Sequence, residues 1–96
     1  LYEEAIKNYD YAISIEKNHF YYNSRAIANI SLRKYIFALN DFNEAININS
    51  EYLNAYKNRS RLYYQLGDFP KSIKDAQKAC TLGDCSLLKL NEKNTN

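Results

Sequence analysis

The chain has 96 residues and a formal net charge of +2, with 46% hydrophobic and 25% charged residues. These proportions are typical of one globular domain, and a net charge so close to zero gives no indication of binding to nucleic acid or to an anionic membrane. No stretch approaches the roughly 18 apolar residues that a membrane span needs, and so short a chain buries too little surface to enclose a deep catalytic cavity.

An internal repeat is the strongest pattern in the sequence. A shift of 34 residues superposes identical residues, among them Tyr22 with Tyr56, Arg25 with Arg59, Leu32 with Leu66, Asp41 with Asp75 and Ala45 with Ala79. A shift of 33 residues brings in the opening segment, with Tyr2 on Tyr35, Ala5 on Ala38, Ala12 on Ala45 and Ile13 on Ile46. Repeats of this length indicate supersecondary units that stack on one another.

Small and apolar residues recur every three or four positions within each unit. Ala38, Phe42 and Ala45 share one helix face, and Tyr22 and Ala26 share one face of the preceding helix. Two helices of about 13 residues joined by a short loop form an antiparallel hairpin. In chain order we expect a helix over about 2–16, two helices within 20–48, two within 53–82 and a short one over 86–93.

The turn inside each hairpin has its own chemistry. Gly67 can take the left-handed conformation that ends a helix, Asp68 can cap the next helix, and Pro70 fits its first turn. The equivalent stretch through Arg33 and Lys34 has neither a glycine nor a capping residue. We therefore expect a less regular turn there, stabilised mainly by packing.

The pattern resembles the tetratricopeptide repeat (TPR), a degenerate 34-residue helix–turn–helix unit. The residues that carry the resemblance are the large aromatics Tyr22 and Tyr56, the small residues Ala26, Ser60, Ala38, Ser72, Ala45 and Ala79, and the aromatics Tyr35 and Phe69. The sequence departs from the family motif at Asn29, where tyrosine is usual, at Arg33, where glycine is usual, and at Ala76, where an aromatic is usual.

The resemblance implies an all-α fold, an α-solenoid of antiparallel helix-turn-helix units in a right-handed superhelix. It covers nearly the whole chain and predicts about two and a half repeats plus a C-terminal capping helix. The expected division is 1–17 for helix B of repeat 1, 19–52 for repeat 2, 53–86 for repeat 3 and 87–93 for the capping helix.

The resemblance also implies a non-catalytic protein–protein interaction module that binds a peptide or partner segment in the concave groove lined by the A helices. The groove residues that it predicts are Phe20, Asn23, Ser24, Ile27, Ile30, Ser31, Asn54, Lys57, Asn58, Arg61, Tyr64 and Gln65. Asparagine amides can both donate to and accept from a peptide backbone. Lys57 and Arg61, four residues apart, could meet an acidic side chain or a terminal carboxylate.

One alternative is co-chaperone-type recognition of the acidic C-terminal tail of heat-shock chaperones. The two-carboxylate clamp of such family members needs asparagine, lysine and arginine at positions where this chain has Ser24, Asn54 and Asn58. Arg25 and Arg59 lie one position further along, where we expect them to face the packing rather than the groove. The clamp is therefore absent in this register.

A second alternative is self-association. In this register the helix over 2–16 lacks the A helix that normally covers it, so Tyr2, Ile6 and Tyr9 would be partly uncovered. An exposed apolar patch of this kind tends to find a partner. We expect an intermolecular contact through residues 1–13, which would make a homo-oligomer possible.

The two cysteines are too few for a disulfide framework or a structural zinc site. We expect Cys80 and Cys85 to be reduced thiols of a cytoplasmic protein, with Cys80 packed as a small apolar group, and a bridge across a helix end as the minor alternative. His19 has no acid or nucleophile near it in sequence, and Asp41, Glu44 and Asp75 are expected on solvated outer faces of the B helices. These residues indicate no catalytic or metal site and no cofactor.

Overall fold

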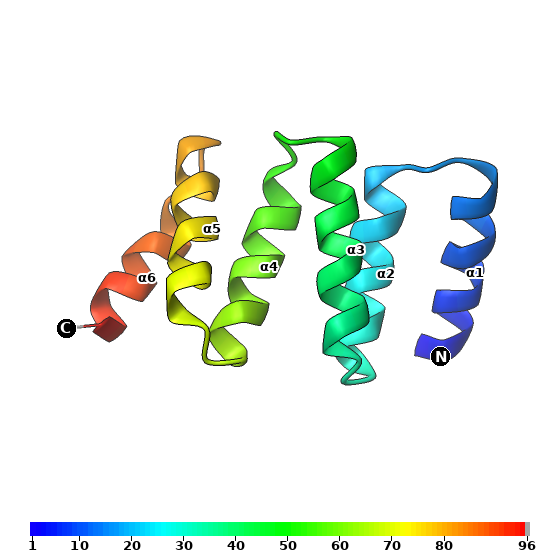
Figure 1. The fold of residues 1–96 in the computed structure, drawn as a ribbon, viewed down its shortest axis with the longest axis horizontal. Coiled ribbons are helices and arrows are strands. Elements are labelled where there is room, and N and C mark those ends of the chain that lie inside the picture. The colour runs from blue at the N-terminus through cyan, green and yellow to red at the C-terminus, as the bar shows by residue number, and fades with distance from the viewer. Residues whose placement is uncertain (96) are drawn as a thin grey trace. The chain divides into compact units, whose positions relative to one another are not determined.

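The computed structural model describes the backbone of residues 1–95 and the side chains of residues 1–90 (Figure 1). Over these residues all regular secondary structure is helical, and the chain divides into two compact units, Leu1–Tyr52 and Leu53–Asn96. Among the described residues, no helix is long and apolar enough to cross a membrane.

The first unit consists of α1 (Tyr2–Ile15), α2 (His19–Ser31) and α3 (Tyr35–Ile48). Helix α2 packs against both α1 and α3. Ala26 and Ala38 are fully buried, and this absence of bulk lets α2 and α3 approach closely around the buried Phe42. The helical spacing read from the sequence therefore corresponds to the face that packs.

The second unit consists of α4 (Leu53–Gln65), α5 (Phe69–Thr81) and α6 (Ser86–Thr95). Helix α5 packs against α4 and α6. Each of the three helices buries an apolar side chain: Leu62 on α4, Ala76 on α5 and Leu87 on α6. Two buried serines join α4 and α5 through reciprocal hydrogen bonds to the opposite backbone. Ser60 Oγ donates to the Ser72 carbonyl at 2.8 Å, and Ser72 Oγ donates to the Ser60 carbonyl at 2.9 Å.

The two intra-hairpin turns have the same backbone hydrogen bonds, which corrects the expectation of a less regular first turn. Arg33 N–H donates to the Ile30 carbonyl and Lys34 N–H donates to the Asn29 carbonyl, the two bonds of a Schellman motif. The second turn repeats these bonds at Gly67 and Asp68. The expectation was wrong because Arg33 itself takes the left-handed conformation, with φ of 59°.

Helix caps differ more than the turns do. Asp68 accepts a hydrogen bond from the Lys71 N–H, and Pro70 lies in the first turn of α5, which confirms both sequence assignments. Lys34 precedes α3 without a side-chain capping bond. Asn18, which the sequence analysis had not assigned, caps α2 by accepting from the Phe20 N–H at 2.8 Å.

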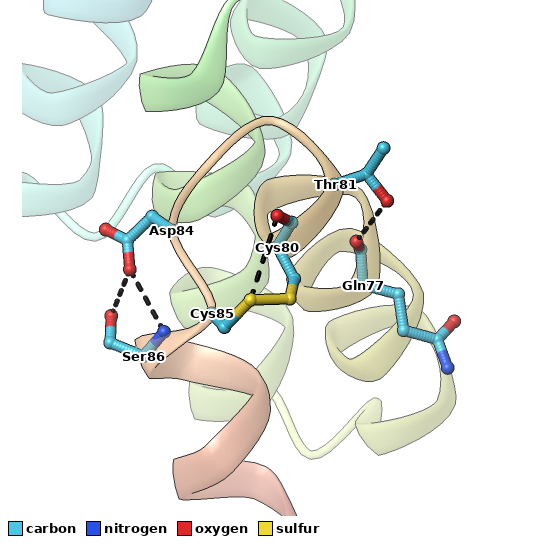
Figure 2. The surroundings of a disulfide bond; sticks show 6 residues. All are labelled: Gln77, Cys80, Thr81, Asp84, Cys85 and Ser86. Atoms are coloured by element: carbon cyan, nitrogen blue, oxygen red, sulfur yellow. Dashed lines mark hydrogen bonds between the residues drawn. A yellow bond between two sulfur atoms is a disulfide. The ribbon is translucent and has the colours of Figure 1, made fainter.

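Cys80 and Cys85 form a disulfide between the end of α5 and the start of α6 (Figure 2). The expectation of two reduced thiols is therefore wrong, and the bridge across a helix end is the arrangement present. The turn through Gly83, with φ of 118°, doubles the chain back and brings the two Cα atoms to 3.9 Å. Five residues of sequence separation had given no indication of that geometry.

Candidate functional site

The exposed face of α2 is mainly apolar. The Phe20 side chain is 54% exposed and the Ile27 side chain is 46% exposed. The half-buried Ser24 lies between them, about one helical turn from each. Ser31 is exposed, and its hydroxyl donates to the Ile27 carbonyl at 3.3 Å. This face offers apolar contact rather than charge.

An aromatic cluster fixes the start of α2. The His19 and Phe20 ring centroids lie 4.3 Å apart, and the Tyr52 ring meets both at 4.6 and 5.4 Å in edge-on geometry. The Asn49 amide lies 3.5 Å from His19 Nε2. Phe20 is therefore held by ring contacts on one side, while about half of its surface stays exposed to solvent. The role of His19 is to pack against these rings.

Asn23 differs from the other predicted groove residues because it is buried, with 6% of its surface exposed. Its amide is consequently closed to a ligand in this structure. Ile30 is half-buried. The accessible part of the α2 face is made by Phe20, Ser24, Ile27 and Ser31.

The exposed face of α4 is polar, and one of its cations already has a carboxylate partner. Lys57 Nζ lies 2.7 Å from Asp84 Oδ2, in the connection between α5 and α6. Asp84 Oδ1 also accepts from the Ser86 hydroxyl at 2.6 Å and the Ser86 N–H at 3.0 Å (Figure 2). The hydrogen bond from Lys57, followed by those from Ser86, lowers the pKa of Asp84 well below its usual value. The sequence analysis had left Lys57 free for an external acid.

Arg61 is the exposed cation of α4. Its Nη1 donates to Asn58 Oδ1 at 3.3 Å, so these two predicted residues do lie together. Tyr64 is partly exposed and packs edge-on against Phe69, with 5.1 Å between ring centroids. Asn54 and Gln65 are also exposed on this helix.

A small hollow of about 100 Å³ opens beside this face of α4. It is lined by Ser60, Arg61, Tyr64, Ser72, Leu87 and Leu90. Leu87 and Leu90 of α6 form an apolar wall of the hollow, and the Arg61 side chain of α4 lies on the other side. The hollow accommodates a small apolar side chain next to a cation.

Each unit also has an ion pair between a partly buried arginine and a buried aspartate. Arg25 holds Asp41 through two bonds of 3.0 and 2.8 Å, and its third nitrogen donates to Asp10 at 2.7 Å. Arg59 holds Asp75 through two bonds of 2.7 and 2.8 Å. Both arginines therefore face the packing, as the sequence analysis predicted.

The aspartates of these pairs correct another expectation. Asp41 and Asp75 are buried rather than on solvated outer faces. The hydrogen bond to Asp41 is the main reason that the pKa of Arg25 is raised above its usual value. Both pairs were detectable in the sequence, because arginine and aspartate recur together at the 34-residue shift.

The face of α1 that was expected to self-associate is partly open. Tyr2 is exposed, while Ile6 and Tyr9 are half-buried, and α1 has no fully buried residue. Self-association through residues 1–13 stays a prediction.

Comparison with known proteins identifies the fold. No family model matches the chain. A solved structure described as the first TPR of Spaghetti (RPAP3) bound to the HSP90 peptide SRMEEVD superposes with a TM-score of 0.87 and 25% sequence identity. The match covers 98% of this chain and 79% of that chain.

Several curated proteins are similar in sequence. The chain is 32% identical over 83 residues to heat shock protein STI1 of Saccharomyces cerevisiae and 35% identical over 75 residues to serine/threonine-protein phosphatase 5 of Homo sapiens. It is 31% identical over 85 residues to protein unc-45 homolog B of Mus musculus. These matches span 14%, 15% and 9% of the relatives' lengths. With its repeat, its helical hairpins and these similarities, the chain belongs to the tetratricopeptide repeat family.

Proposed function

We propose that this chain is a non-catalytic protein-interaction module, with one peptide-binding surface on the exposed face of α2 in the first unit and another on the exposed face of α4 in the second. The observation that carries the proposal is the superposition, over 98% of the chain, on a TPR domain bound to a peptide. The whole-protein activities of the curated relatives are not part of the proposal, since the chain spans about a seventh of their length or less.

The two faces favour different parts of a ligand. Phe20 and Ile27 on α2 offer apolar surface, while Arg61 on α4 offers an exposed cation beside a hollow for a small side chain. A guanidinium binds a carboxylate through charge-assisted hydrogen bonds. We therefore expect the α2 face to bind apolar side chains and the α4 face to bind a carboxylate.

Acidic-tail recognition is the second candidate function, because the superposed domain holds an HSP90 peptide that ends in acidic residues. The residues of this chain modify that expectation. Asn54 and Asn58 replace the clamp cations, and Lys57 is paired with Asp84. Arg61 is consequently the cation that we expect to contact the tail.

Calorimetric titration with the peptide SRMEEVD tests the proposal. We expect saturable binding that weakens about tenfold in Arg61→Ala, because a charge-assisted hydrogen bond contributes roughly 1.5 kcal/mol. Lys74→Ala is the matched control, since Lys74 is an exposed cation on α5. Equal affinities of the Arg61→Ala variant and the unmodified protein would exclude the α4 face.

An amide-resolved titration of the same complex locates the binding surface. The proposal expects shifts of the backbone amides of α2 and α4, around Phe20, Ile27 and Arg61. Shifts confined to α1, α3 or α5 would overturn it.

A further inference from the structure

The start of α3 carries an exposed surface that the proposed function does not use. Ile36 is 76% exposed and Phe37 is 61% exposed, and the half-buried Tyr35 separates them from the exposed Arg33 and Lys34. The four exposed residues are called the α3 patch below. Two neighbouring large apolar side chains exposed to this degree on one turn of helix are a recognised feature of interaction surfaces.

Two hollows adjoin the α3 patch. One of about 330 Å³ is formed by the stretch from Arg33 to Phe37. The other, of about 440 Å³, lies between α1 and α3 and is lined by Ile6, Asp10, Arg25, Asn29, Lys34, Phe37, Asn40 and Asp41. Lys34 and Phe37 line both hollows, so Phe37 stands between two places where a partner's side chain can enter.

The cations of the α3 patch are available to a partner. Within the described part of the chain, neither the Arg33 nor the Lys34 side chain has a hydrogen bond or ion pair. The floor of the larger hollow is different, because there Arg25 is saturated by Asp41 and Asp10. That floor holds two carboxylates against one guanidinium, so the positive charge offered to a partner is confined to Arg33 and Lys34 at the edge of the apolar surface.

The backbone gives an independent reason to assign a role to Arg33. Arg33 has a φ angle of 59°. The equivalent position of the other two turns is glycine, with a φ angle of 82° at Gly67 and 118° at Gly83. A residue with a Cβ atom is strained in this conformation, because its Cβ lies too close to the carbonyl oxygen that follows. The stability of the turn therefore favours glycine at position 33, and it does not explain why an arginine is present there.

We propose that the α3 patch is a docking surface for an acidic segment of a partner protein that carries at least one apolar side chain. Carboxylates of the segment pair with Arg33 and Lys34, and its apolar side chain enters a hollow beside Phe37. Because the patch belongs to α3, this interaction is separate from peptide binding on α2 and α4.

An acidic protein segment fits the patch better than an anionic membrane does. Two cations hold an anionic bilayer only weakly, because attachment through charge takes a larger cluster of lysine and arginine residues. The hollows on both sides of Phe37 suit individual side chains rather than a flat surface. A carboxylate that pairs with a guanidinium also gains directional hydrogen bonds.

The test is an amide-resolved titration of the full chain with a short peptide of alternating glutamate and phenylalanine. Its matched control replaces every glutamate by glutamine. We expect shifts centred on the amides of residues 33–40 and an affinity at least tenfold lower for the glutamine peptide. Equal affinity for both peptides, or shifts confined to other helices, would overturn the proposal.

Two variants separate docking from folding. Lys34→Glu should weaken binding of the glutamate peptide about tenfold, while Lys74→Glu on α5 should not change it. Arg33→Gly should weaken binding and at the same time raise the thermal midpoint, which no folding defect can do. Unchanged binding in both patch variants would overturn the proposal, as would binding of phosphatidylserine vesicles without binding of the acidic peptide.

Discussion

The α2–α3 and α4–α5 hairpins have equivalent backbone hydrogen bonds in their turns but pack through different side chains. At the interface of the two helices, the buried Ala26 and Ala38 in the first hairpin correspond to Ser60 and Ser72 in the second. The alanines make only apolar contact, whereas the serines add reciprocal hydrogen bonds. Side-chain size is therefore the shared requirement, and the hydroxyl is tolerated only because its hydrogen bonds are satisfied.

The buried ion pairs also differ in their surroundings. In the first hairpin Asp41 accepts a third hydrogen bond, from Asn29 at 3.2 Å. In the second hairpin the residue equivalent to Asn29 is Tyr63, whose ring centroid lies 5.9 Å from the Arg59 guanidinium carbon. Both arginines lie over a tyrosine ring, and Arg25 also bonds to Asp10. The difference is therefore on the aspartate side, where Asp41 has a donor besides its arginine, so the two pairs should respond differently to loss of the cation.

The largest expected effect comes from removing that cation. Arg59→Ala leaves Asp75, only 4% exposed, without another partner among the described residues, and should lower the free energy of unfolding by about 3–5 kcal/mol. Arg25→Ala should cost about 1 kcal/mol less, because the Asn29 amide still donates to Asp41 and the lost bond to the exposed Asp10 contributes little. Urea unfolding measures both values.

The same comparison has an internal control. Asn29→Ala combined with Arg25→Ala removes the remaining donor to Asp41, so the loss should rise to the Arg59→Ala value. Equal losses in the two single arginine variants would show that Asn29 does not compensate.

The disulfide gives the second largest effect, and only the second unit has it. Reduction opens a loop with a sequence separation of 5 and should lower the stability of that unit by about 2 kcal/mol on the chain-entropy relation. Hydrogen exchange measured with and without reductant should show that reduction lowers the protection of amides in α5 and α6. The protection of amides in α2 and α3 should not change. Alkylation of both cysteines in the unreduced protein would contradict the bridge.

The repeat made most of the fold predictable. Helices expected over about 2–16 and within 20–48 are found at Tyr2–Ile15, His19–Ser31 and Tyr35–Ile48, since the spacing of small and aromatic residues fixes which face packs. The turn through Gly67 and its cap at Asp68 followed from local chemistry that needs no tertiary information. These features depend on residues close together in sequence.

The features that were missed depend on where a chain segment returns in space. The Lys57–Asp84 pair was not foreseen, and the Cys80–Cys85 bridge was only the minor alternative, because both require the path of the connection between α5 and α6, which spacing does not give. The left-handed Arg33 was missed because glycine is the usual residue in that conformation. The predicted ligand-binding role of the groove residues stays a prediction.

The serine pair of the second hairpin predicts a smaller, non-additive effect. Ser60→Ala or Ser72→Ala alone should cost about 1 kcal/mol, because each removes a buried hydrogen bond while leaving the other hydroxyl in place. The double variant reproduces the alanine pair of the first hairpin and should cost less than the sum of the single changes. Urea unfolding of all three variants completes the cycle, and strict additivity would argue against the reciprocal pair.

The smallest effect is an exchange of residues between the two turns. Arg33→Gly should stabilise the first hairpin by about 1 kcal/mol, because glycine takes a positive φ without the Cβ clash. Gly67→Ala should destabilise the second by a similar amount, and since nothing lies within 4 Å of the added Cβ, the cost is purely that of the backbone. Thermal unfolding of the two variants should move in opposite directions. A different outcome is that Arg33→Gly leaves the midpoint of thermal unfolding unchanged while Gly67→Ala lowers it. In that case contacts of the Arg33 side chain offset the cost of its left-handed backbone, and the two turns are energetically equivalent despite their different residues.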